Sequence, residues 1–145
     1  MDMRDRVDIL AIYLHLARAS ERRRRPQVRD RLFVLAAVAA TRAGLLRIAA
    51  YCRRVVVESN AQHLIRRWPT VADALRDAEF RHFLTHLEKR YSQENAEQLL
   101  QSLAIERGHE RDTYYSDEEY AAGIIGVSLE ALYELFPDPS ASNDD

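Results

Sequence analysis

Two spacings that combine glutamate with histidine come closest to known site chemistry in this sequence. Glu79 precedes His82 by three residues, and His86 follows four residues later. Residues at these intervals share one face of a helix, so the three side chains could converge on a metal ion. Glu106 and His109 repeat the first interval. The sequence therefore offers Glu79, His82 and His86 as candidate metal ligands.

Too few further ligands accompany these histidines to make a metal centre the leading interpretation. Glu106 and His109 fall in a charged connector around Gly108 rather than in a strongly helical segment. The N-terminal half is also basic, which opposes the binding of a dication. We interpret the histidines as surface or helix-end residues, expect no cofactor, and keep metal binding as a second alternative.

The arginines are the second feature with chemical potential. Residues 1–70 contain 15 Arg and 6 acidic residues, whereas residues 71–145 contain 6 basic and 17 acidic residues. Arginine pairs bidentately with carboxylate and with phosphate. Two interpretations follow: the two halves neutralise each other within a chain or across a dimer, or the basic half binds nucleic acid or another polyanion.

The arginines that would bind such a polyanion lie in one charged linker and two later segments. Arginine beside an exposed aromatic ring suits single-stranded nucleic acid. Trp68 precedes Pro69, a position that also suits a hydrophobic anchor between the two halves. The predicted anion- or nucleic-acid-binding residues are Arg22, Arg23, Arg24, Arg25, Arg53, Arg54, Arg66, Arg67 and Trp68.

Signals for covalent catalysis are missing from the sequence. It contains no glycine-rich phosphate loop and no G-x-S-x-G motif. The lone Cys52 stands between Tyr51 and Arg53 in a predicted helix, where we expect it to be buried and inert. A non-enzymatic protein is the better expectation.

The elements that position these residues are predicted to be helices throughout. The chain has 145 residues, 47% of them apolar and 30% charged, with only 4 Gly and 4 Pro. This composition predicts one all-α domain, a compact bundle of about six or seven helices over residues 1–136, basic over 1–70 and acidic over 71–136. Residues 137–145 are predicted to form a flexible acidic tail. The expected helices cover 3–19, 27–43, 45–59, 61–67, 71–90 with a break near Asp77, 93–105, 117–125 and 129–136.

No segment is apolar for long enough to predict a membrane span. The longest apolar run, Leu32–Ala40, has nine residues, whereas a spanning helix needs about 20. We expect a cytoplasmic protein, and the single cysteine agrees with a reducing compartment.

The segment 116–136 resembles the helix-turn-helix of TetR-type and related bacterial repressors. The resemblance lies in Ala121 and Ala122, in the Gly126–Ser128 turn, and in Leu132 and Tyr133. In that family the second helix reads the major groove with polar or basic side chains. Here that helix carries Glu130 and Glu134 and no basic residue, which would repel phosphate. The acidic pattern favours a structural corner or a protein-docking surface.

The sequence as a whole predicts a non-enzymatic protein–protein interaction module. The helix over residues 3–19 is apolar on more than one face, which suggests that a partner, such as a second copy, covers it. The predicted docking residues are Tyr120, Leu132, Tyr133 and Phe136. Polyanion binding by the arginines is the alternative.

Overall fold

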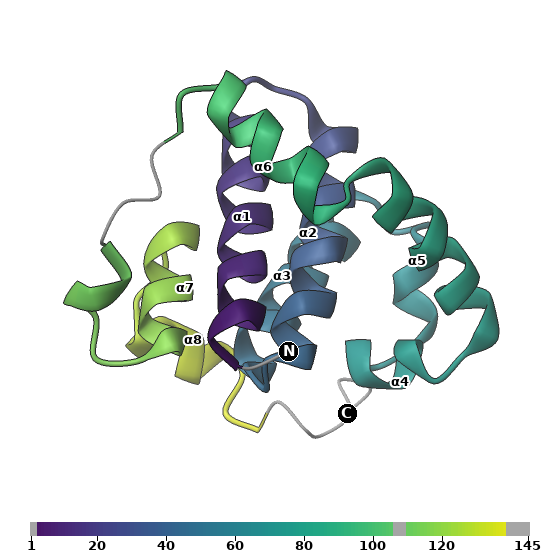
Figure 1. The fold of residues 1–145 in the computed structure, drawn as a ribbon. Coiled ribbons are helices and arrows are strands. Elements are labelled where there is room, and N and C mark those ends of the chain that lie inside the picture. Colours follow the sequence, from purple (N-terminus) through teal and green to yellow (C-terminus); the bar gives the residue numbers. More distant parts are fainter. Residues whose placement is uncertain (1–2, 106–109, 139–145) are drawn as a thin grey trace.

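Three long helices form the centre of the molecule. The computed structural model describes residues 3–105 and 110–138, and in these residues it contains helices and no strand. The central helices are α1 (Met3–Arg22), α2 (Pro26–Arg42) and α3 (Leu46–Ser59), and each packs against the next. Their connections are short, so consecutive helices run antiparallel (Figure 1). The predicted all-α helical bundle is confirmed.

Helix α2 is the most deeply buried element. Every residue from Leu32 to Ala40 is buried, and nine consecutive residues point to all sides of a helix. Such a helix has to be covered on all sides. Helices α1 and α3 pack on it, as do α4 (Val71–Leu75) and α5 (Ala78–Arg90).

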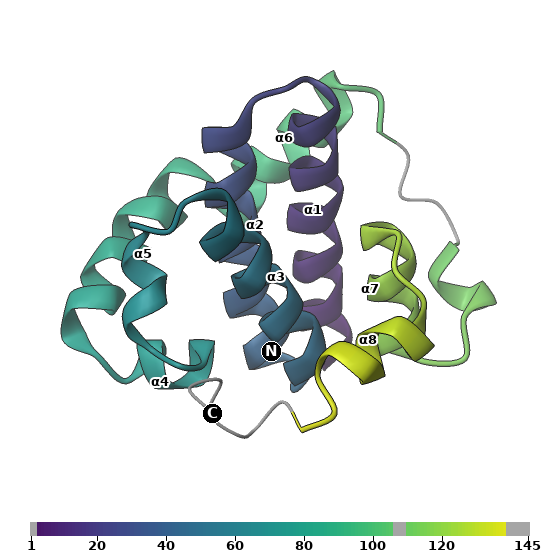
Figure 2. The ribbon, with the colours of Figure 1, turned by 180° about the vertical axis from the view of Figure 1, so that it is seen from behind.

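Helix α1 is covered by its own chain. It contacts α2, α6 (Gln93–Ser102) and α7 (Asp117–Ile125), and α6 lies on the face opposite to α3 (Figures 1 and 2). These contacts bury residues all around α1, namely Val7, Leu10, Ala11, Ile12, Tyr13, Leu14, Leu16, Ala17 and Ala19. The apolar surface of this helix is therefore covered without a second copy of the chain.

The remaining elements close the two sides of the bundle. The 3-10 helix η1 (Leu64–Arg67) leads into α4, and η2 (Glu110–Thr113) leads into α7. Helix α8 (Leu129–Leu135) packs on α3. One buried cluster extends from Leu10 to Phe136 and includes residues of every α-helix. Of the predicted acidic tail, residues 139–145 lie outside the described residues. No helix in the described ranges is long and apolar enough to cross a membrane.

The helix boundaries follow local capping chemistry. The hydroxyls of Thr70, Ser92, Ser116 and Ser128 each accept a hydrogen bond from a backbone N–H in the first turn of the helix that follows. The break near Asp77 is real, because its carboxylate caps α5 through the N–H of Glu79 at 2.8 Å. The described residues form eight α-helices, because the expected segment 71–90 divides into α4 and α5 and the expected segment 61–67 contains only the 3-10 helix η1. Asn60, the C-cap of α3, has an extended backbone, with φ −142°.

The turn between α1 and α2 departs from these local preferences. Arg24 has φ +58°, in the left-handed region that costs a residue with a Cβ about 1 kcal/mol or more. At the corresponding turn after α2 the chain uses Gly44, with φ +76°. Arg25 is the N-cap of α2 and makes no side-chain cap hydrogen bond. Arg24 and Arg25 therefore occupy two positions where other residue types would make the protein more stable.

We expect the buried face of α1 to carry a large share of the stability. Leu14→Ala removes a side chain with 0% exposure, so it should lower the free energy of unfolding by about 3 kcal/mol. Leu135→Ala makes the same chemical change at a residue that is 42% exposed, and it should cost well under about 1 kcal/mol. Urea denaturation measures both. Equal losses would contradict the burial described for α1.

The unfavourable turn predicts that replacing its arginines stabilises the protein. Arg24→Gly relieves the left-handed backbone, and Arg25→Ser supplies a cap for α2. The double variant should gain about 1–2 kcal/mol of unfolding free energy, seen as a Tm higher by several degrees. Arg23→Gly is the control, since Arg23 does not have a positive φ, and it should give no gain. A double variant no more stable than the parent would disprove the strain.

Candidate anion-binding site

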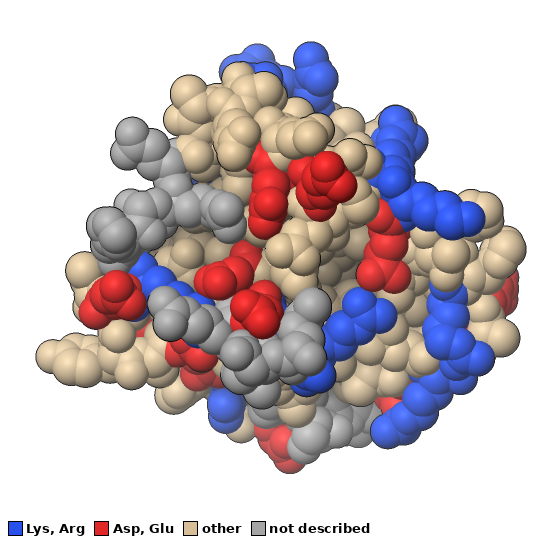
Figure 3. Space-filling view, viewed as in Figure 1, with Lys and Arg blue, Asp and Glu red and all other residues tan. Residues whose placement is uncertain are grey.

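Four consecutive arginines occupy the last position of α1 and the turn that leads to α2. All four, from Arg22 to Arg25, are exposed. Within residues 3–105 and 110–138, none of their guanidinium groups has a hydrogen bond, ion pair or ring contact. Figure 3 shows basic side chains projecting at the end of the molecule where this turn lies. The turn therefore presents a compact group of cations with free N–H donors.

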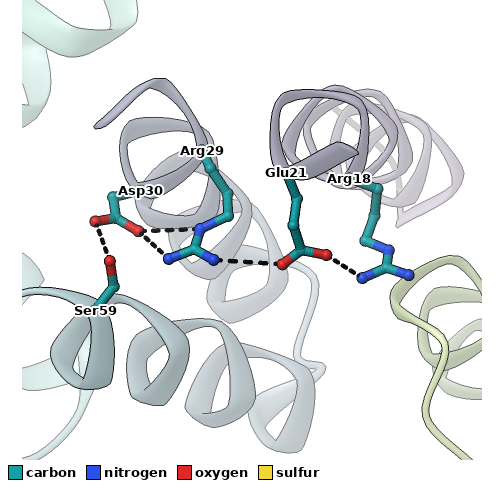
Figure 4. A network of polar contacts seen from close by, with 5 residues as sticks. All are labelled: Arg18, Glu21, Arg29, Asp30 and Ser59. Atoms are coloured by element: carbon teal, nitrogen blue, oxygen red, sulfur yellow. Dashed lines mark hydrogen bonds and ion pairs between the residues drawn. The ribbon is translucent and has the colours of Figure 1, made fainter. Parts of the chain in front are cut away.

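The helices on either side of the turn are joined by a polar network (Figure 4). Glu21 of α1 pairs with Arg18 in its own helix and with Arg29 of α2, the latter at 3.4 Å from Oε2 to Nη1. Arg29 in turn donates to Asp30 at 3.1 Å. The Ser59 hydroxyl of α3 donates to the other oxygen of Asp30 at 2.9 Å. The network links the ends of all three central helices.

This network also balances its own charge. It contains two arginines and two carboxylates, and Asp30 is buried. A buried carboxylate needs such partners, since an unpaired buried charge is costly. Because Glu21 and Asp30 are already engaged, they leave the charges of Arg22–Arg25 uncompensated. The four-arginine turn is thus a site of net positive charge beside helix ends that ion pairs join together.

The side chains of three predicted anion-binding residues, Arg53, Arg66 and Trp68, contact other parts of the protein. Arg53 donates from Nε to the carbonyl of Trp68 at 3.0 Å and from Nη2 to the carbonyl of Arg66 at 3.4 Å. Arg66 donates to the carbonyl of Ala61 at 3.1 Å. The Trp68 ring packs edge-on against Phe80 with centroids 5.5 Å apart. Trp68 is the anchor between the two halves that its position predicted.

Arg54 and Arg67 are paired with carboxylates. Arg54 contacts Glu58 one turn along α3 at 2.8 Å, and Arg67 contacts Glu79 at 2.6 Å. Only the turn arginines, among the predicted anion-binding residues, are free of partners in the described structure. Sequence reasoning missed this distinction, because the pairing depends on which segments meet in space.

The candidate metal ligands do not assemble into a site. His82 and His86 are adjacent on α5, with their Nε2 atoms 3.3 Å apart. Glu79 is instead engaged by Arg67. Among the described residues, no group of three or more His, Cys, Asp or Glu could hold a metal ion. Glu106 and His109 lie outside those residues.

The predicted docking residues are mostly inside the molecule. Tyr120, Leu132 and Phe136 are buried, and Leu132 has no exposed surface. Tyr133 alone is exposed, and its hydroxyl donates to Glu118 at 2.8 Å while Arg47 lies 4.4 Å above its ring. These four residues do not form a surface patch. Their apolar spacing reflects the packing of α7 and α8 onto the bundle.

The corner formed by α7 and α8 has the geometry that its sequence predicted. Gly126 adopts φ +88° after α7, and the Ser128 hydroxyl accepts the N–H of Ala131 at 3.1 Å. Glu130 and Glu134 are exposed on α8. An acidic outer face of this kind repels the phosphates that a DNA-reading helix has to approach.

The two oppositely charged halves are joined by few ion pairs. In the described ranges three pairs cross between them: Arg42 with Glu88, Arg67 with Glu79, and Arg111 with Asp8. The other ion pairs lie within one half, such as Arg111 with Asp117. Neutralisation between the halves therefore leaves the turn arginines unmatched.

Cys52 fits the expectation of an inert residue. It is fully buried in α3, and this burial raises the pKa of its thiol well above the ordinary value. A protonated, inaccessible thiol is a poor nucleophile.

Comparison with known proteins adds no further constraint on these sites. No protein-family model, no curated protein and no solved structure matches this chain.

Proposed function

We propose that this protein is a non-enzymatic interaction module that binds an acidic segment of a partner protein through Arg22–Arg25. The observation that carries the proposal is the exposure of four adjacent arginines with no partner in the described structure. Each guanidinium offers donors in the geometry that carboxylates accept. These charges also stand at unfavourable positions, because Arg24 has a left-handed backbone and Arg25 makes no side-chain cap for α2. Backbone strain of this kind is typical of functional sites.

The site is better matched to a short acidic peptide than to nucleic acid. The turn is compact, and the other predicted arginines are occupied by intramolecular contacts. Binding of single-stranded nucleic acid relies on stacking with aromatic rings. In the part of the chain that the structure describes, the exposed aromatic residues Tyr115 and Tyr133 lie in the segment of η2 to α8 rather than near this turn, and Trp68 packs on Phe80.

A labelled oligoglutamate peptide tests the site directly. The triple variant of Arg22, Arg23 and Arg25 to Gln should weaken its binding about tenfold, because each exposed ion pair contributes a few tenths of a kcal/mol or more. Fluorescence anisotropy at low ionic strength measures this, and added salt should weaken binding further. The matched control replaces Arg54, Arg67 and Arg76 by Gln, which removes the same charge from paired arginines.

Two results would overturn this proposal. Loss of binding in the control to the same extent would show that net charge alone matters. Tighter binding of an oligothymidylate of equal length, lost in the triple variant, would assign the site to nucleic acid instead.

A second variant should act in the opposite direction. Glu21→Gln removes the carboxylate that neutralises Arg18 and Arg29 beside the turn. The local potential becomes more positive, so oligoglutamate should bind a few-fold more tightly. Thermal unfolding serves as the accompanying check, since the loss of two partly exposed pairs should cost only about 1 kcal/mol. Unchanged or weaker binding would place the peptide elsewhere.

A further inference from the structure

A pocket of about 590 Å³ lies between α1, α2, the end of α5 and the start of α6. This volume is typical of sites for small molecules, which run from about 300 to 1,000 Å³. Its apolar lining comes from Ile9 of α1 and from Leu35, Val38 and Ala39 of α2. The face seen in Figure 3 shows basic and acidic side chains around an area of uncharged residues.

Charged groups from three helices line the same pocket. Arg6 of α1 donates from Nη1 to the backbone carbonyl of Arg42 at 2.8 Å. Arg42 of α2 contacts Glu88 of α5, with 3.3 Å between Nη1 and Oε2. A guanidinium has five N–H donors, and the contacts within the described residues use one on each arginine. Two cations and one anion leave this lining with a single excess positive charge.

The hydroxyl of Tyr13 is a polar group in the pocket wall that a hydrogen bond holds in place. It donates to the carbonyl of Tyr91 at 2.7 Å. Burial, and to a smaller degree the charge of Glu88, raise the pKa of Tyr13 to about 12 against the opposing effect of Arg42. The phenol is therefore neutral and its proton is committed to a backbone carbonyl. Such a group shapes and orients a ligand rather than exchanging protons with it.

We propose that this pocket binds a medium-chain monocarboxylate, such as a fatty acid. The carboxylate would pair with Arg6 and Arg42, and the alkyl chain would lie on Leu35, Val38 and the other apolar lining residues. A single excess positive charge suits a monoanion. An amine would face two guanidinium groups, and a dianion would be repelled by Glu88.

Calorimetric titration of the intact protein with hexanoate, octanoate and decanoate tests the ligand class. Decanoate should bind one-to-one, and each added methylene should tighten binding about fourfold until the pocket is full. Methyl NMR signals of Leu35 and Val38 should shift on binding. Absence of decanoate binding, or equal binding of decyltrimethylammonium, would overturn the proposal.

Two variants locate the ligand at both ends. Arg42→Gln removes a carboxylate partner and should weaken decanoate binding about tenfold. Ala39→Leu fills the apolar part and should abolish binding. Ala50→Leu makes the same change in a separate groove, of about 260 Å³, and should leave binding intact. If the Ala39→Leu variant fails to fold, Arg42→Gln still tests the site, because the Arg42 guanidinium is half-exposed and its loss should not unfold the protein. Unchanged decanoate binding in the Arg42→Gln variant would refute the assignment.

The pocket and the four-arginine turn lie at opposite ends of α1. Arg6 and Arg22 are sixteen residues apart on α1, which places the two sites about 24 Å apart along the helix. The triple glutamine variant of the turn should therefore bind decanoate like the parent. Loss of decanoate binding in that variant would show that the carboxylate binds the turn and not the pocket.

Discussion

The burial of α2 on all sides is the constraint on which the rest of this structure depends. A nine-residue run without a polar side chain, Leu32–Ala40, cannot face water on any side of a helix. Two long neighbours, α1 and α3, cover only part of its circumference. The short helices α4 and α5 cover another part, and α6 and α7 do the same for α1. The chain thus uses many small elements to enclose one apolar hairpin.

The same constraint determines where charge can lie. The middle of the α1–α2 hairpin excludes ions, so its cations are displaced to the two ends. Arg6 and Arg42 meet at one end, and Arg22–Arg25 form the other. Antiparallel packing brings residues from opposite ends of two helices together, which is why Arg6 and Arg42 share a pocket although 36 positions separate them. Both proposed binding sites are consequences of one packing arrangement.

Sequence reasoning succeeded where the determining physics is local. Ser116, Ser128 and Asp77 each satisfy N–H groups within three residues, so the starts of their helices can be read from the chain. It failed where the partner is distant. Tyr120 and Leu132 have the spacing of either a docking face or a core face, and only the position of α3 and α1 makes them core. Likewise Arg67 and Arg23 are equivalent in sequence terms, yet Glu79 engages only the first.

The α1–α2 turn shows how stability and binding can compete at one place. Gly44 and Gly126 supply the left-handed residue after α2 and α7, and serine or threonine caps begin α4, α6, α7 and α8. Ala104 after α6, with φ +54°, and Leu45 before α3, which makes no cap hydrogen bond, depart from this pattern. At Arg24 and Arg25 the chain has neither a glycine nor such a cap. Helix α1 ends with its partial negative charge at this turn, which favours Arg22 and Arg23, but the positive end of α2 disfavours Arg25. The helix dipoles therefore account for Arg22 and Arg23 but not for Arg24 and Arg25, and the ion pair of Glu21 with Arg29 joins α1 to α2 beside this turn.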